Sequence, residues 1–136
     1  MAGVAAPRGI YETVLYGDDV DALVAFYTDV VGLRSIDPPD EFSAAFRMDD
    51  GGLLLIFDPE HSSVPGRFVP SHGASGEGHI AFRVGAGQLA PVVDGLRTTG
   101  LEIEREITWP RGGSSVYIRD PAGNSVEFVE GDIWDP

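Results

Sequence analysis

The stretch GHIAFRV, from Gly78 to Val84, carries the pattern from which the fold is predicted. Its residues fall into an apolar set, Ile80, Phe82 and Val84, and an alternating set, His79, Ala81 and Arg83. Apolar residues at every second position are typical of a strand with one face against a core. The sequence therefore predicts that His79 lies on the face that points away from the core.

Two further stretches repeat this arrangement with a carboxylate in place of the imidazole. In NSVEFVE (124–130), Glu127 lies on the face opposite to Val126 and Phe128. In YETVLYG (11–17), Glu12 opens a similar alternating run. Because successive side chains of a strand point to opposite faces, each of the three strands presents one potential metal ligand. This recurrence predicts a metal site formed by Glu12, His79 and Glu127.

The order of predicted elements is the same in the two halves of the chain. Strands are predicted at 11–17, 33–37, 42–48, 52–57, 78–84, 101–108, 114–119 and 125–130, with helices at about 20–31 and 89–96. The first helix has apolar residues three and four positions apart and ends at Gly32, and the second ends at Gly100. Each half therefore reads as strand, helix and three strands.

Matching landmarks in the two halves are separated by a nearly constant offset of about 70 residues, which indicates an internal duplication. We therefore predict an α+β fold, a single domain over 1–136, made of two tandem βαβββ modules. The modules span 10–58 and 78–131, with a linker at 59–77. Their mixed sheets are expected to curl into a cup with the helices outside. The offset pairs Glu127 with Ile56, so positions 12, 56, 79 and 127 are expected to converge.

The composition of the chain excludes several other functions. Its 136 residues include 22 acidic and 9 basic residues, and the net charge of −13 argues against nucleic-acid and membrane partners. There are no cysteines, which excludes disulfides and thiolate metal sites. The longest apolar run, Leu53–Phe57, is far too short to span a bilayer, and no signal peptide is recognised, so a cytoplasmic location is expected.

Three stretches together resemble the vicinal oxygen chelate superfamily, which includes glyoxalase I, extradiol dioxygenases and bleomycin-binding proteins. They are LYGDDVDALVAFYTDVVGLR (15–34), GHIAFRV (78–84) and VYIRDPAGNSVEFVE (116–130). The resemblance implies metal ligands on the first and last strand of each module, which correspond to Glu12, Ile56, His79 and Glu127. The sequence departs from the family pattern at two of these positions. Glu12 stands where a histidine is usual, and Ile56 cannot bind a metal.

The resemblance and the ligand pattern together predict a metal-dependent enzyme of the lyase or isomerase type. A small molecule with adjacent oxygens would chelate Mn²⁺, Zn²⁺, Fe²⁺ or Mg²⁺, and a carboxylate, Glu12 or Glu127, would move a proton. One alternative is a metal-free protein of the antibiotic-resistance type that binds a small molecule. Another is an extradiol dioxygenase, although Glu12 argues against the usual iron site.

Several other residues are candidates for substrate binding. They are Ile56 as a pocket wall, Trp109 and Arg111 in a glycine-rich loop, and Tyr117 and Arg119 on one strand. The alternative for each of the last four is an ordinary loop or surface role. His61 and His72, in the linker, are expected to be exposed rather than catalytic. A homodimer is expected because the short strands leave sheet edges to cover, and the sequence leaves open whether one chain completes the cup.

Overall fold

The computed structural model describes residues 5–135 and divides into two halves, each built around one sheet. The first half contains β1 (Glu12–Tyr16), α1 (Val20–Ala25), the π-helical segment η1 (Phe26–Val30), β2 (Arg34–Ser35), β3 (Ser43–Arg47), β4 (Leu53–Phe57) and α2 (Pro59–Ser62). The second half contains β5 (His79–Val84), α3 (Leu89–Thr98), β6 (Arg105–Thr108), β7 (Ser114–Arg119) and β8 (Ser125–Glu130). We call β1–β4 with α1 and η1 the first module, and β5–β8 with α3 the second module.

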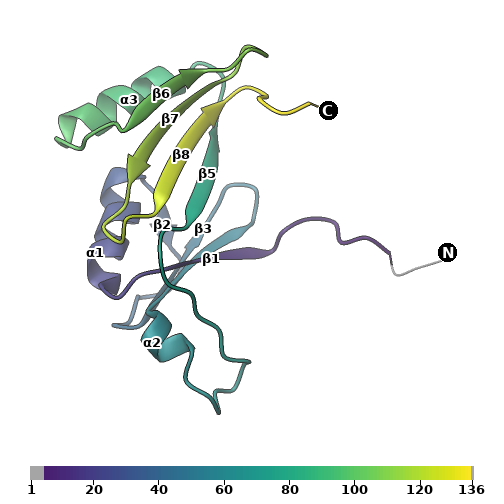
Figure 1. Cartoon of the computed structure of the whole chain (residues 1–136), viewed down its shortest axis with the longest axis vertical. Helices are drawn as coiled ribbons and strands as arrows, with labels where there is room; N and C mark the ends of the chain where they lie inside the picture. Colours follow the sequence, from purple (N-terminus) through teal and green to yellow (C-terminus); the bar gives the residue numbers. More distant parts are fainter. Residues whose placement is uncertain (1–4, 136) are drawn as a thin grey trace.

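The two sheets have the same topology. Their strand orders are β1-β4-β3-β2 and β5-β8-β7-β6, with the first and last strand of each module parallel and the other neighbours antiparallel. Figure 1 shows the first sheet below and the second above, as separate layers. The predicted α+β fold with two βαβββ modules of mixed sheets is confirmed.

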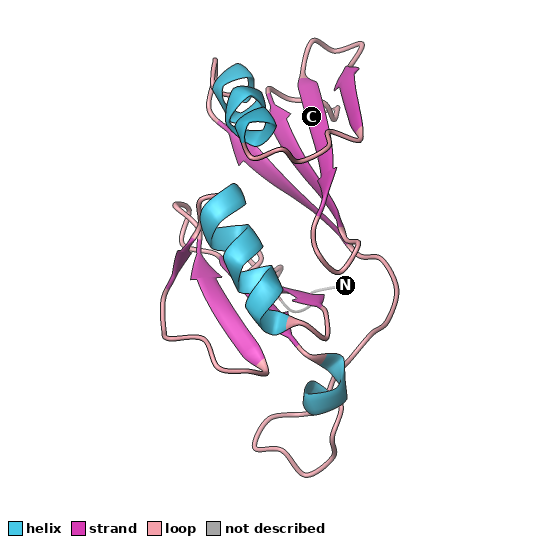
Figure 2. Ribbon diagram, turned by 90° about the vertical axis from the view of Figure 1, so that its left-hand side faces the viewer, coloured by secondary structure: helices cyan, strands magenta, loops and turns pink. Residues whose placement is uncertain are grey.

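The helices cover one face of each sheet and leave the other face open. α1 contacts β3 and β4, and α3 contacts β7 and β8. Figure 2 shows both helices on the same side of their sheets. The core fills this side with residues such as Leu54, Ile56, Val126 and Phe128, while His79 and Glu12 lie on the open faces. No helix within residues 5–135 is long and apolar enough to cross a membrane.

The first helix forms where its apolar pattern predicts. Asp19 caps its start, since the carboxylate accepts a hydrogen bond from the Ala22 amide at 3.0 Å. Leu23 and Tyr27 are fully buried against the first sheet. The second half of the helix, however, is π-helical, and Gly32, with a φ of 87°, ends it.

Three predicted elements differ from the structure. The strand predicted at 33–37 is only β2, and the one at 101–108 is only β6, because both are edge strands in which just a few residues pair with a neighbour. The predicted linker contains the short helix α2, capped by Asp58, whose side chain accepts from the Glu60 amide at 3.0 Å. Periodicity does not predict a single helical turn, because the turn is too short to repeat a pattern.

A buried polar cluster joins the two modules. The Tyr27 hydroxyl, from the first module, donates a hydrogen bond of 2.7 Å to Oδ2 of Asp120 in the β7–β8 turn. Asn124 in the same turn donates to the Tyr16 carbonyl at 3.4 Å and accepts from the Gly78 amide at 2.7 Å. This turn lies beside α1 in Figure 1. The cluster therefore fixes the turn, the start of β5 and the first module relative to one another.

Candidate metal centre

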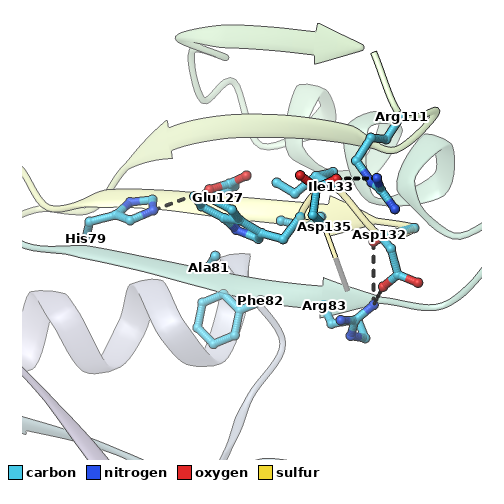
Figure 3. A pocket seen from close by; sticks show the side chains of 12 residues that line it. His79, Ala81, Phe82, Arg83, Arg111, Glu127, Asp132, Ile133 and Asp135 are labelled. Carbon is cyan, nitrogen blue, oxygen red and sulfur yellow. Dashed lines mark hydrogen bonds and ion pairs between the residues drawn. The ribbon is translucent and has the colours of Figure 1, made fainter. Parts of the chain in front are cut away.

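His79 and Glu127 meet on the open face of the second sheet. β5 and β8 are parallel neighbours, in a register that pairs His79 with Ser125 and Ala81 with Glu127. The two side chains leave the same face from adjacent strands, and His79 Nε2 lies 3.3 Å from Glu127 Oε1 (Figure 3). An imidazole nitrogen and a carboxylate oxygen are thus brought together by the alternation that the sequence shows.

The carboxylate of Glu127 is buried without full hydrogen bonding. The residue is only 5% exposed, and its Oε2 atom has no hydrogen-bond partner among the described residues. A buried carboxylate oxygen without a donor or a cation costs several kcal/mol in the folded state (about 1–3 for an ordinary polar group, more for a charged one). Such an atom in a native protein needs an explanation, and an ordered water, a bound ion or a catalytic role can each supply it.

The orientation of His79 leaves one ring nitrogen available to a ligand. Nδ1 lies 3.1 Å from the Ser125 carbonyl oxygen. Because a carbonyl can only accept, Nδ1 carries the hydrogen, and in the neutral ring the lone pair is on Nε2. Nε2 faces Oε1 of Glu127, so the two lone pairs point toward each other, and a proton or a metal ion between them would relieve their repulsion. A backbone carbonyl that fixes the outer ring nitrogen is the usual partner of a metal-binding histidine.

The donor pair fits a divalent metal ion. Two ligands that are each about 2.1 Å from one ion at a roughly tetrahedral angle are about 3.4 Å apart, close to the observed 3.3 Å. An imidazole nitrogen and a carboxylate oxygen suit Zn²⁺, Fe²⁺ or Mn²⁺. Within residues 5–135, however, no third histidine, aspartate or glutamate joins the pair. One chain therefore supplies two of the ligands that such an ion needs.

Tyr117 lies next to this pair. It is the cross-strand partner of Glu127, and its ring stacks near the His79 ring with centroids 6.4 Å apart. Partial burial, together with the neighbouring Glu127 carboxylate, raises the pKa of the Tyr117 hydroxyl above its ordinary value. Tyr117 therefore stays a neutral phenol near the site and can act as a hydrogen-bond donor there.

A cavity of about 800 Å³ opens beside His79 and Glu127. It is lined by His79, Ala81, Phe82, Arg83, Arg111, Glu127 and Val129, and by the C-terminal residues Gly131–Asp135. All of these belong to the second module or to the segment that follows it. The cavity is large enough for a small organic molecule, and besides Glu127 its charged side chains are two arginines and two aspartates.

The structure brings together only part of the predicted site. Glu12 is exposed on the open face of the first sheet and does not reach the cavity. The expectation for Ile56 is wrong, because this residue is fully buried among core side chains on the helix-covered face. The register shows why, since Ala81 pairs with Glu127 and its counterpart Val14 pairs with Leu55. The residue equivalent to Glu127 is therefore Leu55, one position earlier than the offset suggested.

Because Ile56 and Leu55 lie on opposite faces of the strand, introducing glutamate at these two neighbouring positions should cost very different amounts of stability. Ile56→Glu buries an unpaired charge in the core and should destabilise the fold by roughly 3–5 kcal/mol without changing metal affinity. Leu55 is half-buried on the open face, so the carboxylate of Leu55→Glu can reach water, and the cost should be only about 1 kcal/mol. Thermal denaturation of the two variants distinguishes the assignments. Equal melting temperatures would contradict the register argument.

The remaining predicted binding residues divide between the cavity and the surface. Arg111 lines the cavity. Trp109 lies at the β6–β7 hairpin, where its indole donates to Ser115 Oγ at 2.8 Å, and it does not line the cavity. Arg119 forms ion pairs with Glu104 at 2.9 Å and Glu77 at 3.0 Å outside the cavity. Arg119 as a substrate-binding residue is thus not supported, because its guanidinium is already engaged elsewhere.

Sequence reasoning missed Arg83 and the C-terminal segment as parts of the cavity. Arg83 follows His79 by four positions on the same strand, so the alternation places both side chains on one face. The alternation along the strand was therefore sufficient to predict Arg83 as a neighbour of His79. The segment Gly131–Asp135 has no periodic pattern, and its place over the cavity depends on a turn at Gly131, where φ is 82°.

Comparison with known proteins gives consistent matches along nearly the whole chain. Residues 9–128 match the family model of the Glyoxalase/Bleomycin resistance protein/Dioxygenase superfamily. A lactoylglutathione lyase of Haemophilus influenzae is 30% identical over 89% of this chain and 91% of its own length. One from Arabidopsis thaliana is 31% identical over 82% of this chain, which spans 40% of that longer protein. The crystal structure of a lactoylglutathione lyase from Agrobacterium tumefaciens is 40% identical, with a TM-score of 0.88 over 95% of this chain and 98% of that one.

The duplicated βαβββ architecture, with an imidazole and a buried carboxylate on an open sheet face, defines the glyoxalase-like class of proteins. The family match covers most of the chain and agrees with the resemblance seen in the sequence. The chain belongs to the Glyoxalase/Bleomycin resistance protein/Dioxygenase superfamily. Its relatives support a glyoxalase-like enzyme of the lyase type.

Proposed function

We propose that this protein is a divalent-metal-dependent enzyme that isomerises a small molecule with oxygens on adjacent carbons. The observation that carries the proposal is the buried carboxylate of Glu127. Its Oε1 atom lies 3.3 Å from the free ring nitrogen of His79, and its Oε2 atom has no hydrogen-bond partner among residues 5–135. His79 and Glu127 would hold the ion. When bound, such an ion polarises a substrate oxygen as a Lewis acid.

The side chains around the pair would perform the remaining tasks. Glu127 is buried, so a carboxylate oxygen that is not engaged with a cation can accept a proton from substrate in a poorly hydrated environment. Tyr117 would donate a hydrogen bond to the substrate or to Glu127, because its hydroxyl keeps its proton. Arg111 and Arg83 supply positive charge at the cavity wall for an anionic part of the substrate.

The relatives suggest a substrate class for this chemistry. Lactoylglutathione, named in the relatives, is a thioester whose carbonyl and hydroxyl oxygens are on neighbouring carbons. We propose that this chain converts the adduct of a thiol and a 2-oxoaldehyde into a 2-hydroxyacyl thioester. The proton on the sulfur-bearing carbon moves to the neighbouring carbonyl carbon, and the hydroxyl proton passes to the former carbonyl oxygen. The sulfur-bearing carbon thereby becomes the thioester carbonyl, and its neighbour carries the hydroxyl group. Atoms and electrons balance, so no oxidant is required.

We further propose that a second copy of the chain completes the site. Glu12 lies at the start of β1, in the position that His79 occupies at the start of β5, but on the other sheet. Within one chain the open face of the first sheet does not join the cavity. In a symmetric homodimer, the first module of each chain would contact the second module of the other chain. The open face of the first module would then cover the cavity of the other chain, and Glu12 would lie beside His79 and Glu127 of that chain.

The proposal is tested by activity and metal content together. Purified protein should convert methylglyoxal and glutathione into a thioester, lose this activity after dialysis against a chelator, and regain it with Mn²⁺, Zn²⁺, Fe²⁺ or Mg²⁺. Metal content is measured by mass spectrometry and product by its ultraviolet absorbance. A metal-free preparation with full activity would contradict the metal-dependent mechanism, and inactivity with every ion would contradict the substrate class.

A further inference from the structure

The C-terminal segment Gly131–Asp135 folds back over the cavity beside His79 and Glu127. Gly131 makes the turn after β8, and Ile133 then packs against Gly113 of the β6–β7 hairpin. A Cβ atom at Gly113 would be only 2.5 Å from Cγ2 of Ile133, so this close approach requires a glycine there. The packing of Ile133 therefore sets the position of the aspartates on either side of it.

These two aspartates neutralise the two arginines of the cavity. Asp132 Oδ1 lies 3.4 Å from Arg83 Nη1, and Asp135 forms an ion pair with Arg111. Figure 3 shows both pairs at the cavity wall, with His79 and Glu127 beyond them. The residues that line the cavity include no lysine and no other arginine. The chain thus places its own carboxylates on both of the cations that an anionic ligand would use.

Both ion pairs are easily broken. The side chains of Arg83 and Asp132 are 73% and 80% exposed, and those of Arg111 and Asp135 are 44% and 88% exposed. Ion pairs at such exposure add little to stability, because water and salt screen them. Trp134, between the two aspartates, is 83% exposed and so contributes little packing of its own. The segment is therefore held by Ile133 and two weak charge pairs.

We infer that the segment Gly131–Asp135 is an intramolecular competitor for the anion site formed by Arg83 and Arg111. A ligand with carboxylate groups displaces Asp132 and Asp135, and the segment, with Trp134, moves away from the cavity wall. The net charge of −13 repels anions from most of the protein surface, so the binding of an anion depends strongly on these two arginines. The inference rests on the proposed function only in taking the cavity to be the ligand site.

Equilibrium binding of glutarate, a small dicarboxylate, tests the inference without turnover. The double variant Asp132→Asn/Asp135→Asn should bind glutarate about 3- to 30-fold more tightly than the wild type at low salt, since two competing pairs are removed. Arg83→Gln/Arg111→Gln should lose the binding. The matched control is Glu102→Gln/Glu106→Gln, which removes two negative charges outside the cavity. Like the two aspartates, Glu106 forms an exposed ion pair, at 3.4 Å from Arg97.

Tryptophan fluorescence then reports whether the segment moves. The chain has two tryptophans, so glutarate should change the emission of the wild type but not of Trp134→Phe. Any one of four results would overturn the inference. The aspartate double variant could bind glutarate no more tightly than the wild type, or the control could bind it as tightly as that variant does. Binding could survive the loss of both arginines, or the emission change could persist in Trp134→Phe. Because no catalysis is measured, a failure of the proposed reaction would leave these results unchanged.

Discussion

Replacing Glu127 with alanine is expected to remove bound divalent metal and to lower turnover of the thiol–methylglyoxal adduct by at least about 100-fold. The variant deletes the buried carboxylate and, within residues 5–135, leaves His79 without a second metal-ligating side chain beside it. His79→Ala should have a similar effect, because it removes the only imidazole among the residues that line the cavity. Metal content after dialysis and initial rates at saturating metal measure the two losses separately.

The linker histidines provide controls for the same measurement. His61 stacks on Phe42 with ring centroids 4.0 Å apart, and Nδ1 of His72 lies 2.6 Å from the Tyr16 hydroxyl. Neither histidine lines the cavity. His61→Ala and His72→Ala should therefore retain metal. If all four alanine variants bound metal alike, the assignment of His79 and Glu127 as ligands would be wrong.

Mixing two inactive variants extends this test to the second copy. Glu12→Ala and Glu127→Ala homodimers should each be inactive if the site combines residues of both chains. In a mixed dimer, one of the two sites carries both substitutions and the other carries neither, so mixing after subunit exchange should restore about a quarter of the wild-type activity. If activity does not return on mixing, Glu12 and Glu127 do not act across a dimer interface.

The alternation of side chains explains why much of the site could be predicted from the sequence. His79 and Glu127 are on the first and last strands of a module, and the period of two places both on the face opposite to Phe82 and Phe128. The parallel pairing of those strands then brings the two side chains within 3.3 Å. A strand pattern and one topological rule were therefore sufficient for this half of the site.

The failures have a different physical origin. The expected match between the last strands of the modules paired Phe57 with Phe128, whereas the strand register makes Leu55 the equivalent of Glu127, so the expected match is wrong by one position. Since the strand period is two, that single step transfers Ile56 from the open face to the core. The separation of Glu12 from the cavity depends on how the two modules dock, and no local pattern reports it.

The docking of the modules leads to a second large expected loss of stability, from Asp120→Ala. Asp120 is only 4% exposed, and its carboxylate accepts hydrogen bonds from the Tyr27 hydroxyl, the amides of Ala122 and Asn124, and the Asn124 side chain. Burial and the Asp120 carboxylate raise the pKa of Tyr27 far above its ordinary value, so its hydroxyl remains a donor at any accessible pH. Alanine leaves these donors without a partner in the protein interior.

At roughly 1–3 kcal/mol for each buried donor that loses its acceptor, with partial relaxation, Asp120→Ala should cost about 3–5 kcal/mol. For a domain of this size, that lowers the melting temperature by about 10–20 °C. Tyr27→Phe removes a single donor and should cost only about 1–2 kcal/mol, because the other bonds of Asp120 persist. In the double variant the two losses should not add, since both remove the same hydrogen bond. The control is Asp94→Ala, at an exposed position of α3. If Asp120→Ala lowered the stability no more than Asp94→Ala does, the cluster would not hold the modules together.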